Sequence, residues 1–132
     1  MKALDTPLLL ELLRGRPGAK RLLPHLQGEE LATTELNLYE LEVIARSEGG
    51  RSREQRRATL AKLRRRLTVL PIDERAVRAG LGRDSAKVGR DPPSVALMLG
   101  AAEAGGCEEW LTTPHGRPLG TGGKLAIRII DV

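Results

Sequence analysis

The chain has 132 residues, of which 40% are hydrophobic and 30% charged, and its formal net charge is +5 at pH 7. This length suits one domain with a packed core, so we predict a single domain over residues 1–132. One cysteine and two histidines exclude a disulfide framework within the chain and a zinc site rich in Cys or His. The absence of Phe, with one Trp and one Tyr, argues against RNA-binding modules built on several stacking aromatic side chains.

The segment 1–14 is rich in leucine but carries two acids, Asp5 and Glu11. It lacks the basic start and the small-residue cleavage site of a secretory signal, so we interpret it as mature protein. No apolar run approaches the roughly 20 residues of a membrane span. We therefore expect a cytoplasmic protein with no membrane partner.

The first half of the chain predicts two strands and three helices. Asp5 or Thr6 can cap a helix that begins at Pro7, because Asp and Thr favour the N-cap and Pro the first turn. Leucines and other apolar residues at three- and four-residue spacing continue the helical pattern. In chain order we expect a strand over 2–4, helices over 7–14 and 19–26, a weak strand over 31–33, and a helix over 34–47.

The second half alternates in the same way. The apolar run 67–70 before Pro71 is typical of a strand. We expect helices over 52–66, 73–81 and 95–104, strands over 67–70, 109–112 and 125–130, a polar stretch over 82–91, and a loop over 114–123. Strands that alternate with helices predict an α/β fold with a parallel sheet covered on both faces.

In such a fold the carboxyl ends of the strands share one rim, and the residues that follow them meet in one crevice. The polar residues at these places are Asp5, Glu35 or Glu40, Ser94 and residues 112–114. Structural alternatives remain open for two of them. Asp5 can simply cap its helix, and Glu40 can be a solvated glutamate.

Residues 51–66 hold eight basic side chains and one acid, a net charge of +7, while the remainder of the chain carries −2. Lys and Arg side chains bind phosphates through counterion release, without sequence preference. A solvated helix face is the usual explanation of a charge run, but an excess this large favours contact with RNA. The candidate RNA-binding residues are Arg53, Arg56, Arg57, Arg64 and Arg65.

Three segments, taken in order, fit one known pattern. They are Lys2-Ala3-Leu4-Asp5-Thr6 with Leu12-Leu13-Arg14-Gly15 behind it, the run Ala32 to Leu41, and the apolar helix 94–104 followed by Gly106 and Trp110-Leu111-Thr112. Together they resemble the PIN domain, and more narrowly the small toxin-type (VapC-like) PIN proteins of bacteria and archaea. The resemblance covers nearly the whole chain. It implies a three-layer α/β/α fold around a central, mostly parallel sheet of four or five strands.

The resemblance also implies a metal site at the strand ends, where family members hold Mg²⁺ or Mn²⁺ with three or four carboxylates and cut RNA. Hard divalent cations of this kind prefer oxygen ligands. Asp5 matches the first acid and Glu40 the second, whereas Ser94 and Pro114 stand where the third and fourth are usual. The candidate replacements are Asp91 and, further back, Asp84. We therefore expect Asp5 and Glu40 as catalytic residues, Asp5, Glu40 and Asp91 as metal ligands, and Thr6, Ser94 and Thr112 as supporting residues.

Two functions of different class follow. The first is a toxin-type endoribonuclease that depends on Mg²⁺ or Mn²⁺ and has an incomplete carboxylate set. The second is an inactive PIN-like module that binds RNA or a protein partner, and the missing acids at Ser94 and Pro114 favour it. The resemblance further implies an antitoxin-like partner and a homodimer. The leucines of the first helix are the expected source of an apolar interface: Leu8, Leu9, Leu12 and Leu13.

Two single residues are not expected to form sites. His115 lies in the predicted loop, and a lone loop histidine is usually a surface residue. Cys107 is followed by Glu108 and Glu109, whose charges raise the pKa of a thiol and argue against a nucleophile.

Overall fold

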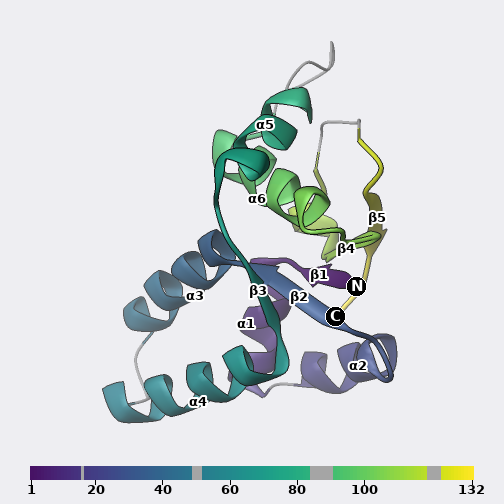
Figure 1. Ribbon diagram of the computed structural model, residues 1–132. Coiled ribbons are helices and arrows are strands. Elements are labelled where there is room, and N and C mark those ends of the chain that lie inside the picture. The colour runs from purple at the N-terminus through teal and green to yellow at the C-terminus, as the bar shows by residue number, and fades with distance from the viewer. Residues whose placement is uncertain (16, 49–51, 84–90, 119–122) are drawn as a thin grey trace.

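The computed structural model describes residues 1–15, 17–48, 52–83, 91–118 and 123–132, and Figure 1 shows its elements. The strands are β1 (Lys2–Leu4), β2 (Leu31–Thr34), β3 (Thr68–Leu70), β4 (Glu109–Thr112) and β5 (Ala126–Ile129). The helices are α1 (Thr6–Arg14), α2 (Pro17–Leu26), α3 (Glu35–Ser47), α4 (Arg53–Arg66), α5 (Glu74–Arg83), α6 (Pro93–Ala104) and the 3₁₀ turn η1 (Pro114–Gly116). Every predicted strand and helix is present.

The five strands form one sheet in the order β3-β2-β1-β4-β5, and each neighbouring pair is parallel. β1 lies in the centre, with Ala3 opposite Ala32 of β2 on one side and Trp110 of β4 on the other. Ala3 and Leu4 are fully buried, as expected of a parallel strand covered on both faces. All five strands therefore end at the same rim of the sheet.

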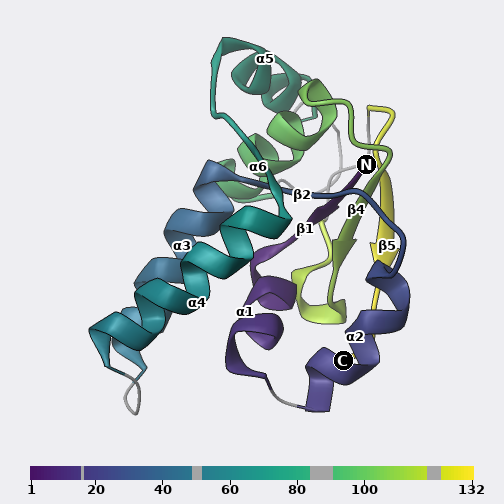
Figure 2. The same cartoon turned by 60° about the horizontal axis from the view of Figure 1, so that its bottom comes forward.

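Helices cover both faces of the sheet and give the predicted three layers (Figures 1 and 2). Successive strand residues point to opposite faces. Leu4 and Leu111 pack on one face with leucines of α1, α2 and α3, and Leu63 of α4 packs against that cluster. Ala3 and Trp110 pack on the other face with residues of α6. The expected α/β/α fold is confirmed.

α5 packs on α6, away from the sheet (Figure 1). A Cβ on Gly100 would collide with backbone atoms of Ala76 and Gly80, and a Cβ on Gly80 would lie 2.9 Å from the carbonyl oxygen of Ala96. Glycine at both positions therefore lets the two helix backbones touch. The close packing fixes α6, whose Met98 reaches the carboxyl rim of the sheet.

Side-chain caps fix where α3 and α4 begin. The hydroxyl of Thr34 accepts from the backbone N–H of Asn37 at 3.1 Å and caps α3. Ser52 and Gln55 form a reciprocal capping box at the start of α4. Such caps satisfy backbone N–H groups that the first helical turn leaves without partners. α1 ends at Gly15, whose φ of 62° lies in the left-handed region that glycine tolerates.

Parts of two predicted loops lie outside the described residues. They are residues 84–90 of the polar stretch, which include the candidate Asp84, and residues 119–122 of the loop 114–123. The start of that loop forms η1. Across the described ranges, no helix combines the length and the apolar character needed to cross a membrane.

Candidate active site

The carboxyl ends of neighbouring strands bring polar side chains together at one rim of the sheet. Asp5 directly follows β1, and its backbone N–H donates to the carbonyl of Leu111 in β4 at 2.9 Å. β4 ends at Thr112 and β2 at Thr34. The side chains of all three polar residues are buried. Buried polar groups need hydrogen-bond partners, so their bonds to one another determine how they are arranged.

Among the described residues, three hydrogen bonds hold the Asp5 carboxylate. Its Oδ1 accepts from the backbone N–H of Thr6 at 2.8 Å and from the side-chain amide of Asn37 at 3.3 Å. Its Oδ2 accepts from the hydroxyl of Thr112 at 2.6 Å. The bond from Thr6 caps α1, so Asp5 caps its helix and lines the rim pocket described below. A carboxylate accepts about four hydrogen bonds, which leaves capacity for one more ligand.

Glu40 extends from α3 to the side chain of Thr6, next to Asp5. The hydroxyl of Thr6 donates to Glu40 Oε1 at 2.9 Å and accepts from Asn37 Nδ2 at 3.0 Å. Asn37 and Glu40 lie three residues apart and therefore share one side of the helix. A continuous network thus joins the two carboxylates, from Asp5 through Asn37 and Thr6 to Glu40.

The sequence patterns did not predict a role for Asn37, which is fully buried. Its Oδ1 accepts from the hydroxyl of Thr34 at 2.6 Å, and its Nδ2 lies 3.3 Å from Met98 Sδ. The backbone and side chain of Asn37 are thus both tied to the end of β2. The one sequence signal that could have indicated this role is the spacing of Asn37, which lies three residues after the N-cap Thr34 and three before Glu40.

Burial raises the pKa of Asp5 above its usual range, because surroundings of low polarity disfavour the charged carboxylate. The hydrogen bonds from Thr112, Thr6 and Asn37 oppose this rise in pKa. The nearby negative charge of Glu40 adds to it. Two carboxyl groups in this arrangement favour a bound cation, which stabilises their charged forms.

A pocket of about 510 Å³ opens at Asp5, Thr6 and Glu40. Its remaining walls are mostly apolar side chains from α1, α3 and α6, and they include Leu10, Tyr39, Val43, Ile44, Val95 and Met98. Among the described residues, no lysine or arginine lines this pocket. Among the described residues, the charged groups that line this pocket are therefore the carboxylates of Asp5 and Glu40.

The turn η1 closes one side of the pocket. A Cβ on Gly116 would collide with the hydroxyl oxygen of Thr112 and would lie 2.9 Å from Asp5 Oδ2. Glycine thus lets the backbone of the turn pass directly beside the carboxylate. Pro114, at the position where the family resemblance implies a fourth acid, begins this turn and is exposed. Of this turn, Gly116 lines the rim pocket, so at this point the chain places glycine backbone beside Asp5, and Pro114 supplies no carboxylate.

The other predicted residues lie outside this network. Ser94 is the second residue of α6, directly before Val95, which lines the pocket. Asp91 precedes the helix and is partly buried. Of these two described residues, neither belongs to the pocket lining. Glu35 is 49% exposed and pairs with Arg64 at 3.4 Å, so its carboxylate is engaged on the outside of α3.

The pair of carboxylates fits a single magnesium-like ion. Within the described ranges, no group of three or more His, Cys, Asp and Glu side chains is placed to hold a metal. Mg²⁺ commonly binds through one or two carboxylates, with water and substrate phosphates as its other ligands. Asp5 and Glu40 supply that minimum, whereas a two-metal site needs more ligands than this.

Cys107 and His115 form no part of the site. Cys107 is buried, and burial raises the pKa of its thiol to about 11, so the thiol is protonated at neutral pH. The neighbouring Glu108 adds less to this rise than burial does. His115 is exposed in η1, as expected.

The chain matches the PIN domain family model over residues 2–86. It belongs to the PIN domain family. Comparison with curated proteins gives no match.

Solved structures show which proteins share this PIN fold. VapBC2 from Rickettsia felis, bound to a promoter DNA fragment, is 16% identical over 98% of both chains, with a TM-score of 0.68. DNA-bound VapBC from Salmonella typhimurium is 20% identical over 97% of this chain and 96% of that chain, with a TM-score of 0.63. VapC20 from Mycobacterium tuberculosis, a toxin that cleaves the sarcin–ricin loop, is 18% identical over 83% and 87%, with a TM-score of 0.60. At these identities the likeness establishes the fold.

This PIN domain carries its excess positive charge on α4, none of whose described side chains is buried. Of the predicted RNA-binding residues, Arg53, Arg57, Arg64 and Arg65 are exposed and Arg56 is partly buried. α4 runs beside α3 in both views of the fold (Figures 1 and 2), and Arg64 pairs there with Glu35. The basic helix therefore borders the same helix that supplies Glu40 to the rim.

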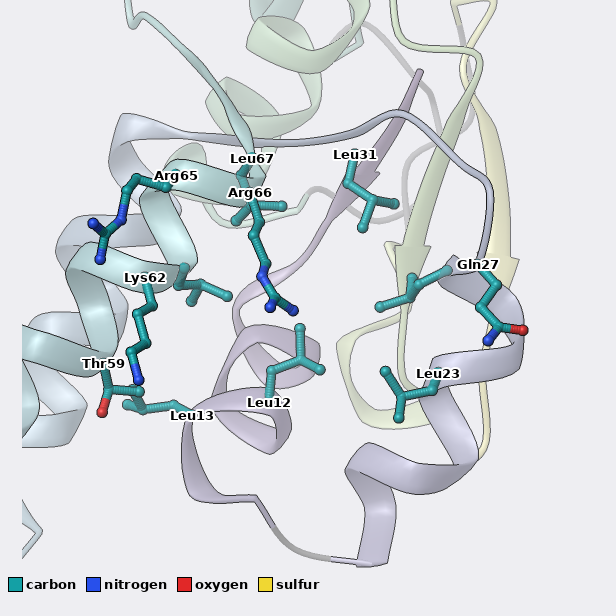
Figure 3. Close-up of a pocket in the computed structure, with 12 residues that line it drawn as sticks. Leu12, Leu13, Leu23, Gln27, Leu31, Thr59, Lys62, Arg65, Arg66 and Leu67 are labelled. Carbon is teal, nitrogen blue, oxygen red and sulfur yellow. The ribbon is translucent and has the colours of Figure 1, made fainter.

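A second pocket of about 680 Å³ lies between α1, α2 and α4 of the PIN domain, and none of its described lining residues belongs to the rim pocket. Its floor is apolar, with Leu12 of α1 and Leu23 of α2 facing it (Figure 3). Lys62, Arg65 and Arg66 line its α4 side, and Arg66 extends toward Leu12. This pocket, called here the leucine groove, joins an apolar surface to positive charge.

Proposed function

We propose that this PIN domain protein is a toxin-type endoribonuclease that uses one Mg²⁺ or Mn²⁺ ion. One observation carries the proposal. The carboxylates of Asp5 and Glu40 come from different elements, are joined through Thr6, and share a pocket whose described lining contains no basic side chain. Carboxylates gathered in this way are stabilised by a divalent cation.

Asp5 and Glu40 would hold the ion, and Ser94 or Asp91 would complete its surroundings through water. A bound divalent ion supplies charge neutralisation at the phosphorus and an activated water. The chain's own residues keep the two carboxylates in position, since Asn37 and Thr112 bind Asp5 while Thr6 binds Glu40. The backbone of η1 passes beside the Asp5 carboxylate, which is buried.

RNA is the proposed substrate because of the charge on α4. The exposed arginines of this helix would bind the phosphate backbone without reading its sequence. The similarity in fold to VapC20, which cleaves the sarcin–ricin loop, supports the same substrate class. This function implies a cytoplasmic protein, since that compartment holds the RNA.

Cleavage of single-stranded RNA in the presence of Mn²⁺ tests this function. We expect the wild type to cut, and Asp5→Asn and Glu40→Gln each to lose at least about a hundredfold in rate, because each variant removes one charged ligand. Glu42→Gln is the matched control on the same helix, and it should cut like the wild type. Equal rates for wild type and Asp5→Asn would contradict the proposal.

A second candidate is an inactive module that binds RNA or a protein. The observation that favours it is the replacement of two family acids by Ser94 and Pro114. Thermal melts with and without Mn²⁺ separate the two candidates, because a ligand that binds only the folded state raises the melting temperature. A saturable rise that Asp5→Ala abolishes would support the nuclease. No rise in the wild type would support the inactive module.

We also propose an antitoxin-like partner, as in the VapBC complexes that share this fold. The leucine groove suits an amphipathic helix with leucines on one face and acidic residues at its edge. A synthetic helix of that composition should bind the wild type, and Lys62→Glu with Arg66→Glu should weaken binding at least about tenfold. Arg78→Glu on α5, a single charge reversal outside the groove, is the control and should leave binding unchanged. The proposed homodimer is measured separately by sedimentation.

A further inference from the structure

Tyr39 is an exposed aromatic side chain at the rim pocket. It is one of two aromatic residues in the chain, and 64% of its surface is exposed. It directly precedes Glu40 on α3 and lines the same pocket as Asp5. An aromatic ring usually contributes to stability by being buried, so the exposed ring of Tyr39 contributes little to the core.

Val43 extends the surface of Tyr39. It follows one helical turn later, is 50% exposed, and lines the same pocket. Residues four apart on a helix lie next to each other, so the ring and the valine form one apolar platform. Val95 and Met98 of α6 contribute further apolar surface to this pocket. Its volume of about 510 Å³ is within the range of small-molecule binding sites.

The platform also lies between the two charged features of the molecule. Glu40 and Asp5 form the rim network on one side. Glu35 lies one turn before Tyr39 on α3 and pairs with Arg64 of α4 at 3.4 Å. A strand held by its phosphates on α4 and entering the carboxylate pocket would therefore pass over Tyr39.

We propose that Tyr39 and Val43 stack a nucleobase of single-stranded RNA beside the phosphate that Asp5 and Glu40 address. The proposal rests on RNA being the substrate, as proposed above. Stacking requires a base whose face is free, so paired RNA would not use the platform. Since every base has a π-face, the platform selects single strands and not a particular sequence.

Binding of a short fluorescent single-stranded RNA tests the platform without cleavage, in Asp5→Asn protein with EDTA present. We expect Tyr39→Ala to weaken binding about tenfold, as removal of one stacking ring does. Tyr39→Phe keeps the ring and should bind within about twofold of its parent. Leu81→Ala on α5 removes an equally exposed apolar side chain, 65% exposed, and should have no effect. RNA substituted with 5-iodouracil should crosslink to Tyr39 under ultraviolet light.

Each contrary result has a distinct meaning. Unchanged binding by Tyr39→Ala, with RNA bound normally by its parent, would overturn the platform and leave the proposed function intact. Absence of RNA binding by the parent would overturn both. A dimer that Tyr39→Ala dissociates in sedimentation would show that a second copy covers the ring, and this would also overturn the platform.

Discussion

The rim pocket and the basic helix α4 hold charge in opposite ways. At the rim, side chains that are distant in the sequence are buried and tied to one another, as Asp5 is to Asn37 and Thr112. On α4 the charges are contiguous in the sequence and exposed, and no described side chain of the helix is buried. The comparison indicates that the fold fixes positions at the rim, whereas on α4 it supplies only charge density. Substitutions at the rim should therefore change stability and metal binding, whereas substitutions on α4 should change RNA binding.

The largest difference is expected in stability. Asn37→Ala removes a fully buried amide and leaves the Thr34 hydroxyl and the Asp5 carboxylate short of a partner. Each polar group left in this way typically costs about 1–3 kcal/mol, and we expect the free energy of unfolding to fall by about 3 kcal/mol. Arg65→Ala on exposed α4 should change it by less than about 0.5 kcal/mol. Urea denaturation of both variants measures their free energies of unfolding. Equal decreases would contradict the expected difference between the rim and α4.

A smaller loss of stability is expected from substitution of Gly116. Gly116→Ala places a methyl group against Thr112 and Asp5, and the backbone of η1 must shift to accommodate it. We expect a decrease of about 1–2 kcal/mol in stability, with weaker Mn²⁺ binding. Gly82→Ala in α5 is the matched control, because its added methyl group meets no atom within 4 Å and Ala favours helix. A stable Gly116→Ala protein with unchanged Mn²⁺ affinity would contradict the close packing of η1.

The pH dependence of stability should also separate the regions. Because burial raises the pKa of Asp5, the folded chain binds this proton more tightly than the unfolded chain does. The resulting stabilisation is complete below the unfolded pKa of about 3.9, and it is lost as the pH rises through the raised pKa of the folded state. In EDTA, the free energy of unfolding of the wild type, relative to that of Asp5→Asn, should therefore fall across this window. Denaturation at a series of pH values measures it, and a constant difference would show that Asp5 is not perturbed.

The smallest effect is expected from single arginines of α4. Removal of one arginine that binds a phosphate of single-stranded RNA should lower the slope of log K against log salt by about 0.7. Arg57→Ala should show such a decrease in RNA-binding titrations, while stability stays unchanged. Arg78→Ala on α5 should leave the slope as it is. An unchanged slope for Arg57→Ala would place the RNA elsewhere.

The fold was largely predictable because strand and helix signals alternate along the chain and each helix has local start and stop residues. The apolar run 67–70 and the cap at Asp5 are signals of this kind. The order of the strands could not be worked out from these local signals. The family resemblance implied a mostly parallel sheet of four or five strands, and the structure shows five parallel strands in the order β3-β2-β1-β4-β5.

The candidate site was predictable only in part. Asp5 and Glu40 stand at sequence positions that the family pattern marks, and they meet in the fold. Asn37 and Gly116 act through contacts between distant segments, which spacing along the chain does not reveal. Cys107 shows the same limit, since its acidic neighbours predicted the direction of the pKa shift but burial is its main cause. Asp91 was chosen by its spacing from Ser94, and its role as a ligand stays a prediction.

Mn²⁺ binding measured by electron paramagnetic resonance tests the central claim most directly, because it reports the metal site without requiring a substrate. Wild-type protein should bind one Mn²⁺ saturably, and Mg²⁺ should compete for it. Glu40→Gln should weaken this binding, the double variant Asp5→Asn with Glu40→Gln should abolish it, and Glu42→Gln should leave it unchanged. Absence of saturable binding in the wild type, or equal binding by the double variant, would contradict a metal site formed by these two carboxylates.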